Sequence, residues 1–267
     1  MNAFNHLHVA SAFSAHFGVT RPELLVEAAV AMGFDALAIT DRNGLYGAVK
    51  HIGACVHFGI DPIVGVDLEV FDSGAPQGQI TLLSHGRKDG QGWRVLCSAI
   101  SLAQHKDKKK PQIGIEKTEL ARLLANGGAT VLLGARSNLG QLALSGDRSA
   151  FTQCLNAWVS LLPTRGTLAV EIVSHITEPG TEFSNGQAKR MLDLADSMRV
   201  PCVLTNAVRY LSPDDAITAD VLDSARHLEP LGLFKPQPNA QAWLKPSNEM
   251  QRLAIEICGS RAHALPN

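Results

Sequence analysis

Short apolar segments alternate with amphipathic segments along most of the chain. Several of the apolar segments are almost continuously hydrophobic, which is typical of strands that are covered on both faces. Because segments with helical spacing separate them, the pattern predicts about seven strands in a largely parallel, helix-covered sheet. The predicted strands are 4–11, 35–40, 62–70, 79–84, 129–135, 167–174 and 201–208.

The segments between these strands predict helices, and many of them end at a glycine or proline. A turn at 73–78 indicates that 79–84 pairs antiparallel with 62–70 or lies beside it. Spacing favours a barrel over an open sheet, and we interpret 1–267 as one domain in which 230–267 forms a C-terminal extension. The predicted helices are 20–32, 45–58, 90–104, 118–125, 148–161, 185–198, 212–228 and one from 248.

Composition narrows the class of protein. The chain has 267 residues, of which 45% are hydrophobic, so it can bury a core and should not be disordered. Its net charge of −1 gives no general attraction to nucleic acids or anionic membranes. No apolar run approaches the roughly 20 residues that span a bilayer, and the N-terminus does not resemble a signal peptide. We expect a cytoplasmic protein.

Two further observations exclude other classes. The five cysteines are widely spaced and form no CxxC pair, which favours reduced, buried thiols over disulfides or a zinc knuckle. The sequence contains no glycine-rich nucleotide loop and no serine-hydrolase motif. The basic run from His105 to Lys110 is either a solvated loop or a contact for DNA phosphates.

The candidate chemistry begins at "FNHLHVAS", residues 4–11. Alternate residues of a strand point to the same face, so His6 and His8 are predicted to lie side by side, with Ala10 next in line. The stretch is either a metal-binding strand that lacks one ligand or a buried strand with two hydrogen-bonded histidines.

Further polar residues stand at the ends of the other predicted strands, where β/α barrels carry their chemistry. Metal clusters in such sites need several carboxylates and neutral imidazoles, whereas arginine is not a ligand. The pattern therefore contains both candidate ligands and residues that argue against metal. The candidates are Asp41, Arg42, Asp67, Glu69, Gln79, His85, Arg136, Glu171, His175, Asn206 and Arg209.

Five segments in order resemble a known family. They are "HLHVASAFSAHFG", "LAITDRNGLYGAVKH", "DPIVGVDLEV", "ITLLSHGRKDGQGWRVLCSAIS" and "VLTNAVRYLSPDDA", and together they cover nearly the whole chain. In order and spacing they are similar to the PHP (polymerase and histidinol phosphatase) domain found at the N-terminus of bacterial C-family DNA polymerases. The resemblance implies a distorted seven-stranded (β/α)7 barrel, with 230–267 leading toward a polymerase core that is not in this sequence.

The resemblance also implies a metal site whose ligands are mostly replaced. The family pattern HLHxHS, for example, has lost its last histidine to Ala10, and the family's TDH has become Thr40-Asp41-Arg42. His8 and Asp67 survive from the usual ligand set. The remnant positions are His6, His8, Asp41, Asp67 and Glu171, and ligands are replaced at Ala10, Phe17, Arg42, Gln79, Ala135, Ala207 and Arg209.

These replacements lead to two competing functions. The first is a non-catalytic structural module of a polymerase III alpha subunit or an error-prone relative, which needs no cofactor. Its expected partners are the polymerase core and a proofreading exonuclease subunit, with DNA contacted at most indirectly. The alternative is a metal-dependent phosphoesterase or 3′–5′ exonuclease with Zn or Mn bound by His6, His8 and Asp67. A stand-alone binding barrel is a third, weaker hypothesis.

A further hypothesis concerns the two arginines at former ligand positions. Arg42 and Arg209 bring fixed positive charge to the place where the family binds metal ions. In charge-assisted pairs with a carboxylate, the guanidinium groups could replace the positive charge of the metal ions. We therefore expect Arg42 and Arg209 to form ion pairs with Asp41 or Asp67.

Overall fold

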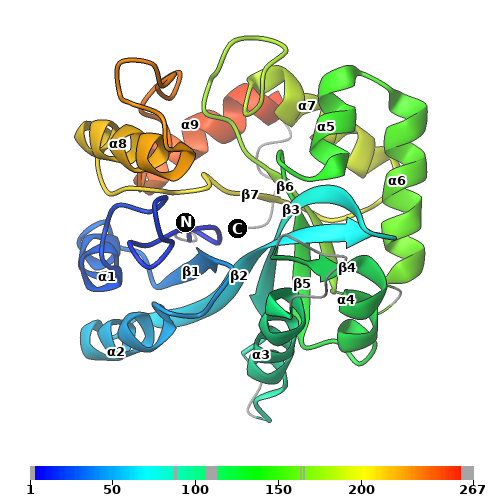
Figure 1. Ribbon diagram of the computed structural model, residues 1–267, viewed down its shortest axis with the longest axis horizontal. Helices are drawn as coiled ribbons and strands as arrows, with labels where there is room; N and C mark the ends of the chain where they lie inside the picture. The colour runs from blue at the N-terminus through cyan, green and yellow to red at the C-terminus, as the bar shows by residue number, and fades with distance from the viewer. Residues whose placement is uncertain (1–3, 87–88, 106–112, 163, 165, 260–267) are drawn as a thin grey trace.

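The computed structural model describes residues 4–86, 89–105, 113–162, 164 and 166–259. Within them, seven strands form one curled sheet with helices around its outer side (Figure 1). The sheet order is β1-β2-β3-β5-β6-β7, and β4 pairs with the C-terminal part of β2. This architecture confirms the predicted distorted β/α barrel. The strands are β1 (Ala36–Arg42), β2 (Asp61–Asp72), β3 (Ala75–Ser84), β4 (Ile115–Glu116), β5 (Ala129–Leu133), β6 (Leu168–Ile172) and β7 (Cys202–Leu204).

One strand runs against the parallel pattern of the sheet. β3 is antiparallel to both β2 and β5, whereas the other pairs are parallel. The β2–β3 turn places Ser73 and Gly74 at φ values of 54° and 81°. Two successive positive φ values match the right-handed twist of a tight hairpin, and glycine adopts such a conformation without steric cost. The predicted antiparallel pairing of 79–84 is confirmed.

The helices lie on the outside of the sheet and connect successive strands (Figure 1). Most of the predicted helices are present within a few residues of their expected bounds. The helix α5, which follows β5 and has Ser137 as its N-cap, was not predicted. The helices are α1 (Pro22–Ala31), α2 (Ala48–Phe58), α3 (Gln91–Gln104), α4 (Lys117–Leu124), α5 (Asn138–Ser145), α6 (Arg148–Leu161), α7 (Asn185–Ser197), α8 (Ala216–His227), preceded by the 3-10 turn η1 (Pro213–Asp215), and α9 (Ser247–Cys258).

The strands bury two different faces. Residues such as Val66, Leu82 and Val170 point outward and join the large core under the helices. Their neighbours point into the barrel, because side chains alternate along a strand. Leu83, Leu132 and Ala169 form a small apolar cluster inside the barrel. Further along the same inward rows stand Asp67 on β2, Thr81 on β3 and Glu171 on β6, so three polar side chains reach the C-terminal mouth of the barrel from neighbouring strands.

The N-terminal segment 4–11 is not a regular strand, and this part of the prediction is wrong. Its backbone is bonded on one side to β1, where Ala38 N donates to His6 O and Thr40 N to Val9 O. On the other side, Ala10 N donates to Val208 O and Val208 N to His8 O. The segment thus fills the gap between the two edges of the sheet. Its backbone hydrogen bonds are too irregular for the segment to count as a strand.

Several sequence-based expectations concern features other than the sheet. All five cysteines are free thiols, and Cys55, Cys202 and Cys258 are buried. None of the described helices combines the length and apolar composition needed to cross a bilayer. The basic run of residues 105–110 lies outside the described residues except for His105.

Candidate functional site

The mouth of the barrel opens into a pocket of about 600 Å³. Its floor carries His8, Asp67 and Glu171, which come from three different parts of the fold. Around the floor stand Phe17, the segment 134–136 after β5, and residues of the connections that follow β6 and β7. The residues 234–239, from the connection between α8 and α9, form part of the rim. This position is where β/α barrels build their sites.

His8 lies between two carboxylates. Its Nδ1 is 2.7 Å from Glu171 Oε1, and its Nε2 is 3.2 Å from Asp67 Oδ2. The carboxylates have further partners, since Thr81 donates to Asp67 Oδ1 and Thr205 donates to Glu171 Oε1, each at 2.6 Å. Both ring nitrogens of His8 therefore face acceptors, and a neutral imidazole could donate to only one of them.

The electrostatics of this trio favour a charged histidine. Burial alone would lower the pKa of His8, but the charges of Asp67 and Glu171 outweigh burial and raise the pKa to about 10. Burial of Asp67 acts in the direction of a higher pKa, and the nearby His8 reverses this effect, so that the pKa of Asp67 is lowered. At neutral pH the floor is thus an imidazolium ion held between two carboxylates.

A glycine makes room for this arrangement. A Cβ atom at Gly134 would lie 2.1 Å from Glu171 Oε2, which is far inside van der Waals contact. Any larger residue at position 134 would therefore require the end of the Glu171 side chain to move. Glycine is needed here for the space beside Glu171. Its backbone freedom is not used, because Gly134 does not have a positive φ.

His6 does not join this site. Its Nε2 lies 2.8 Å from the backbone oxygen of Lys245, and its ring contacts Phe4 and Phe34 edge-on. Burial lowers the pKa of His6 to about 4, so the ring is neutral. The prediction that His6 and His8 share one face is wrong, because the segment that carries them is irregular. Of the two alternatives for the first segment, metal ligand or buried hydrogen-bonded histidine, His6 matches the second.

Asp41 fastens the N-terminal loop. It accepts hydrogen bonds from the backbone N of Ser11 and from the hydroxyls of Ser11 and Ser14, at 2.7–3.0 Å. Burial raises its pKa, although the same hydrogen bonds act in the opposite direction. Asp41 is not among the residues that line the pocket. It stabilises the loop that carries Phe17.

Four guanidinium groups surround Phe17. The ring centroid lies 3.3 Å from Cζ of Arg42 and 4.0 Å from that of Arg209. Arg226 and Arg136 follow at 5.7 and 5.9 Å. Contacts of this kind are attractive because the face of an aromatic ring is negative. Phe17, at a position where the family resemblance implies a replaced ligand, thus organises a cluster of arginines, which we call the arginine wall.

The ion pairs expected for Arg42 and Arg209 are not formed. Arg209 pairs with Asp223 at 2.9 Å and donates to Phe17 O, and Asp223 also pairs with Arg226 at 2.7 Å. Arg42 donates to Gln79 at 3.2 Å. Burial and the nearby Arg136 lower the pKa of Arg42 to about 9. The sequence-based hypothesis failed because the partner carboxylate comes from α8, far away in sequence.

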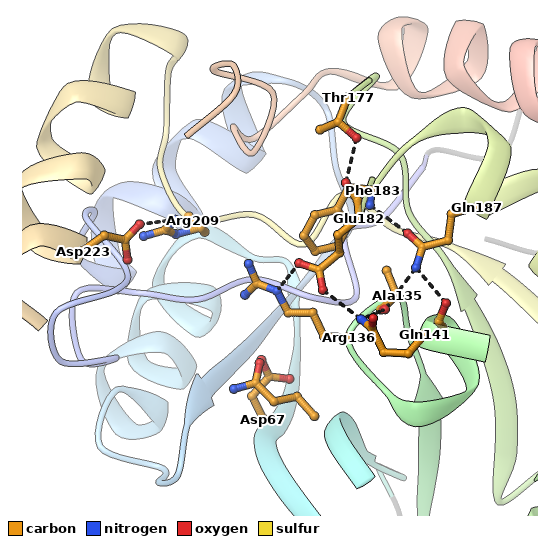
Figure 2. A network of polar contacts seen from close by, with 12 residues as sticks. Asp67, Ala135, Arg136, Gln141, Thr177, Glu182, Phe183, Gln187, Arg209 and Asp223 are labelled. Atoms are coloured by element: carbon orange, nitrogen blue, oxygen red, sulfur yellow. Dashed lines mark hydrogen bonds and ion pairs between the residues drawn. The ribbon is translucent and has the colours of Figure 1, made fainter. Parts of the chain in front are cut away.

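Figure 2 shows the polar contacts on both sides of the pocket. On one side, Arg209 pairs with Asp223. On the other side, Arg136 pairs with Glu182 at 3.1 Å, and Glu182 also accepts from Gln141. These contacts connect the end of β5 to the loop between β6 and α7.

The remaining replaced positions have small side chains. Ala10 is buried, and Ala135 offers its backbone oxygen to the amide of Gln187 at 3.1 Å. Ala207 lines the pocket with a φ of 43°. Alanine provides no metal ligand at any of these positions, so the structure adds no side-chain donor where the sequence lost one.

The residues present do not fit a metal cluster. An imidazolium has no free lone pair for a metal, and the two carboxylates of the floor, Asp67 and Glu171, already bind His8 and two threonines. Among the described residues, no group of three or more His, Cys, Asp or Glu side chains is placed to hold a metal ion. The metal content of the protein stays a prediction.

Several residues of the site were missed from the sequence. Asp223 and Arg226 lie on α8, and Glu182 and Phe183 lie in the loop after β6. The only local signal was the i, i+3 spacing of Asp223 and Arg226, which is common on helix surfaces. Other candidates lie apart from the trio: His85 binds Thr130, and His175 binds the backbone oxygen of Asn206.

Comparisons with known proteins place the chain in a family. A model of the PHP domain matches residues 6–175, and the chain therefore belongs to the PHP domain family. It is 31% identical over 258 residues to the DNA polymerase III subunit alpha of Buchnera aphidicola subsp. Acyrthosiphon pisum, covering 95% of this chain and 21% of that protein. The corresponding subunit of Pseudomonas fluorescens is 28% identical over 259 residues, with 96% and 21% covered. The chain spans about a fifth of the length of these relatives.

A solved structure supports the fold. A proposed metal-dependent phosphoesterase from Bifidobacterium adolescentis superposes with a TM-score of 0.52 at 13% identity, covering 76% of this chain and 86% of that one. At this identity the likeness concerns the fold alone. It is consistent with the curled, helix-covered sheet.

Proposed function

We propose that this PHP domain is a non-catalytic structural and docking module of a bacterial DNA polymerase of the polymerase III alpha type. It would act in the cytoplasm, in DNA replication or repair. Its partners would be the polymerase core of the same chain or complex and a proofreading exonuclease subunit. Support comes from the kinship with polymerase III alpha subunits over most of the chain.

One observation carries the non-catalytic part of the proposal. His8 lies between Asp67 and Glu171 as a cation and uses the carboxylate oxygens that a metal would need. Metal-dependent hydrolysis requires an ion that activates water and polarises the phosphoryl oxygen. An imidazolium in that place and arginines on the adjacent wall would leave little room for such an ion, which supports a non-catalytic role.

The competing candidate is an active metal-dependent phosphoesterase or 3′–5′ exonuclease. It is worth testing because Asp67, Glu171 and His8 do converge at the floor of a pocket. Deprotonation of His8 and displacement of its hydrogen bonds would be needed before any metal could bind there.

Metal content and activity separate the two candidates. We expect the purified chain, after dialysis, to contain no stoichiometric zinc, manganese or iron by elemental analysis. We also expect no release of nucleotides from a 3′ end and no phosphomonoester hydrolysis with added Mn²⁺ or Zn²⁺. The matched control is His57→Ala, which removes an exposed histidine of α2. Two or more metals per chain, or an activity lost in His8→Ala and kept in His57→Ala, would refute the proposal.

The docking role has its own test. Size-exclusion chromatography of the full chain, mixed with a polymerase III alpha core lacking its own PHP domain, should show a stable complex. A second mixture with the proofreading exonuclease subunit tests the other partner. If neither mixture forms a complex at micromolar concentrations, the docking role fails even if the chain is metal-free and inactive.

A further inference from the structure

The arginine wall carries more positive charge than its own carboxylates balance. Arg209 and Arg226 share Asp223, and Arg136 pairs with Glu182. Arg42 has no carboxylate within 4 Å among the described residues, and its contact is the neutral Gln79. Around Phe17, four guanidinium groups thus face two carboxylates, and three of the four, Arg136, Arg209 and Arg226, line the pocket.

The floor offsets only part of this imbalance, because its two carboxylates face the single imidazole of His8, and Asp67 also acts to raise the pKa of Arg42. Asp67 and Glu171 are each hydrogen-bonded to His8, which is itself a cation. On the rim, the charges of Glu178 and Lys235 are opposite in sign and offset each other. The arginines also disfavour one another: burial lowers the pKa of Arg209 most, Asp223 acts in the opposite direction, and Arg136 and Arg226 lower the pKa further. A bound anion would relieve this repulsion.

Unpaired donors point to the same kind of ligand. Arg209 is 6% exposed and lines the pocket, and its Nε is buried without a hydrogen-bond partner. The Nε of Arg42 is also buried without a partner. Arg136 uses Nε for Glu182, and no hydrogen bond of its terminal nitrogens is found among the described residues. Guanidinium groups match the planar fork of carboxylate, sulfate and phosphate oxygens, and a buried donor without an acceptor is costly.

We propose that the pocket binds the oxyanion group of a small ligand, a carboxylate, sulfate or phosphate, on Arg136, Arg209 and Arg226 without a metal ion. A cation would find three of the four carboxylate oxygens of the floor already hydrogen-bonded. The cavity of about 600 Å³ leaves room for an organic part beyond the anion. Phe183, whose ring centroid lies 5.1 Å from Cζ of Arg136, provides an apolar surface for it. This inference does not depend on the docking role proposed above.

The test measures anion binding in the absence of metal. Inorganic sulfate, inorganic phosphate and acetate are titrated separately into the full chain in EDTA at constant ionic strength, with chloride as the compensating anion. Binding is followed by calorimetry and by the rise in Tm, which saturates only for a specific site. We expect saturable binding of at least one anion. The order of affinities distinguishes a phosphoryl or sulfuryl group from a carboxylate.

Two variants locate the site. Arg136→Gln and Arg226→Gln remove half-exposed members of the wall and should each weaken binding at least tenfold. Arg122→Gln removes the same charge from the exposed side of α4 and should leave binding unchanged. Circular dichroism checks that each variant folds. The proposal is overturned if no anion binds saturably, if all three variants behave alike, or if binding appears only after a divalent metal is added.

Discussion

The floor and the arginine wall of the pocket contain similar chemistry but differ in how completely their charges are paired. On the floor, His8 has one carboxylate on each ring nitrogen, and each carboxylate has a threonine hydroxyl as a further donor. On the wall, four guanidinium groups surround Phe17, and among the described residues their ion-pair partners are Asp223 and Glu182. Two buried Nε donors stay without partners.

The difference separates residues that stabilise the barrel from residues that remain available for a ligand. A fully paired buried cation is costly to break, because removing it leaves buried charges of one sign. A surplus of like charges contributes little to stability and favours an incoming ion of opposite charge. The floor is therefore expected to dominate stability, and the wall is expected to dominate binding.

The largest effect should follow from removing the central cation. His8→Ala leaves Asp67 and Glu171 buried side by side without a counter-charge, which should lower the free energy of unfolding by about 3–5 kcal/mol. Urea denaturation at pH 7 measures the loss. His57→Ala, which changes an exposed histidine, should cost less than about 0.5 kcal/mol. Equal and small losses in both variants would mean that the floor is not held by charge.

The next effect concerns the buried pair of the wall. Arg209→Ala should lower the free energy of unfolding by roughly 3 kcal/mol, the lower end of the range for a broken buried pair, because Asp223 keeps Arg226 as a partner. A double-mutant cycle of Arg209→Ala and Asp223→Ala should give a coupling of about 0.5–3 kcal/mol. The cycle of Arg209→Ala with Asp67→Ala should be nearly additive, and a strong coupling there would contradict the observed pairing.

The pH dependence of stability distinguishes the floor from other buried groups. The folded-state pKa of His8 is raised to about 10, above the ordinary value of 6.5. Its stabilisation is therefore complete below about pH 6.5 and is lost as the pH rises toward 10. Lys245, whose pKa burial lowers to about 8, acts in the opposite sense.

The measurement is accordingly the difference in unfolding free energy between the wild-type chain and His8→Gln, from pH 6 to pH 10. This difference should shrink steadily as the pH rises. On the acid side, His6 and His175 have pKa values lowered to about 4 and about 3, so their neutral burial destabilises the fold as the pH falls below 6.5. A difference that is independent of pH would show that His8 is not protonated in the folded chain.

The smallest effect on stability is expected at the half-exposed edge of the wall. Arg136 and Glu182 have side chains that are 37% and 35% exposed, and pairs of this kind contribute about 0–1 kcal/mol. Arg136→Gln should thus leave the denaturation midpoint almost unchanged. A loss comparable to that of His8→Ala would remove the distinction between the stabilising floor and the available wall.

The fold was largely predictable from the sequence because its strands are apolar on both faces. β2 and β3 are long, β6 is short but buried at every position, and the position of each strand therefore follows from the local pattern. β4 has only two residues, which leaves no periodic signal in the sequence. The segment 4–11 has a strand-like sequence, but its tertiary position between two sheet edges makes its backbone irregular.

The site was only partly predictable, since its pairing depends on contacts between distant parts of the chain. His8, Asp67 and Glu171 could be named from strand ends and family resemblance. The partner of Arg209 could not be named, because Asp223 lies on α8 and nothing in the local sequence relates it to the barrel mouth. Arg136 was visible at a strand end, but its proximity to Phe17 depends on the loop that Asp41 fastens.

His8 also changes what this barrel requires from its surroundings. A metal ion is exchanged with the cell and is lost during starvation or to competing proteins, whereas an imidazolium is tethered to the backbone and travels with the chain from synthesis onward. If the protein binds no metal, as proposed above, the barrel mouth carries its own counterion, and its assembly should be independent of metal supply. In exchange, the integrity of this region becomes linked to the proton concentration.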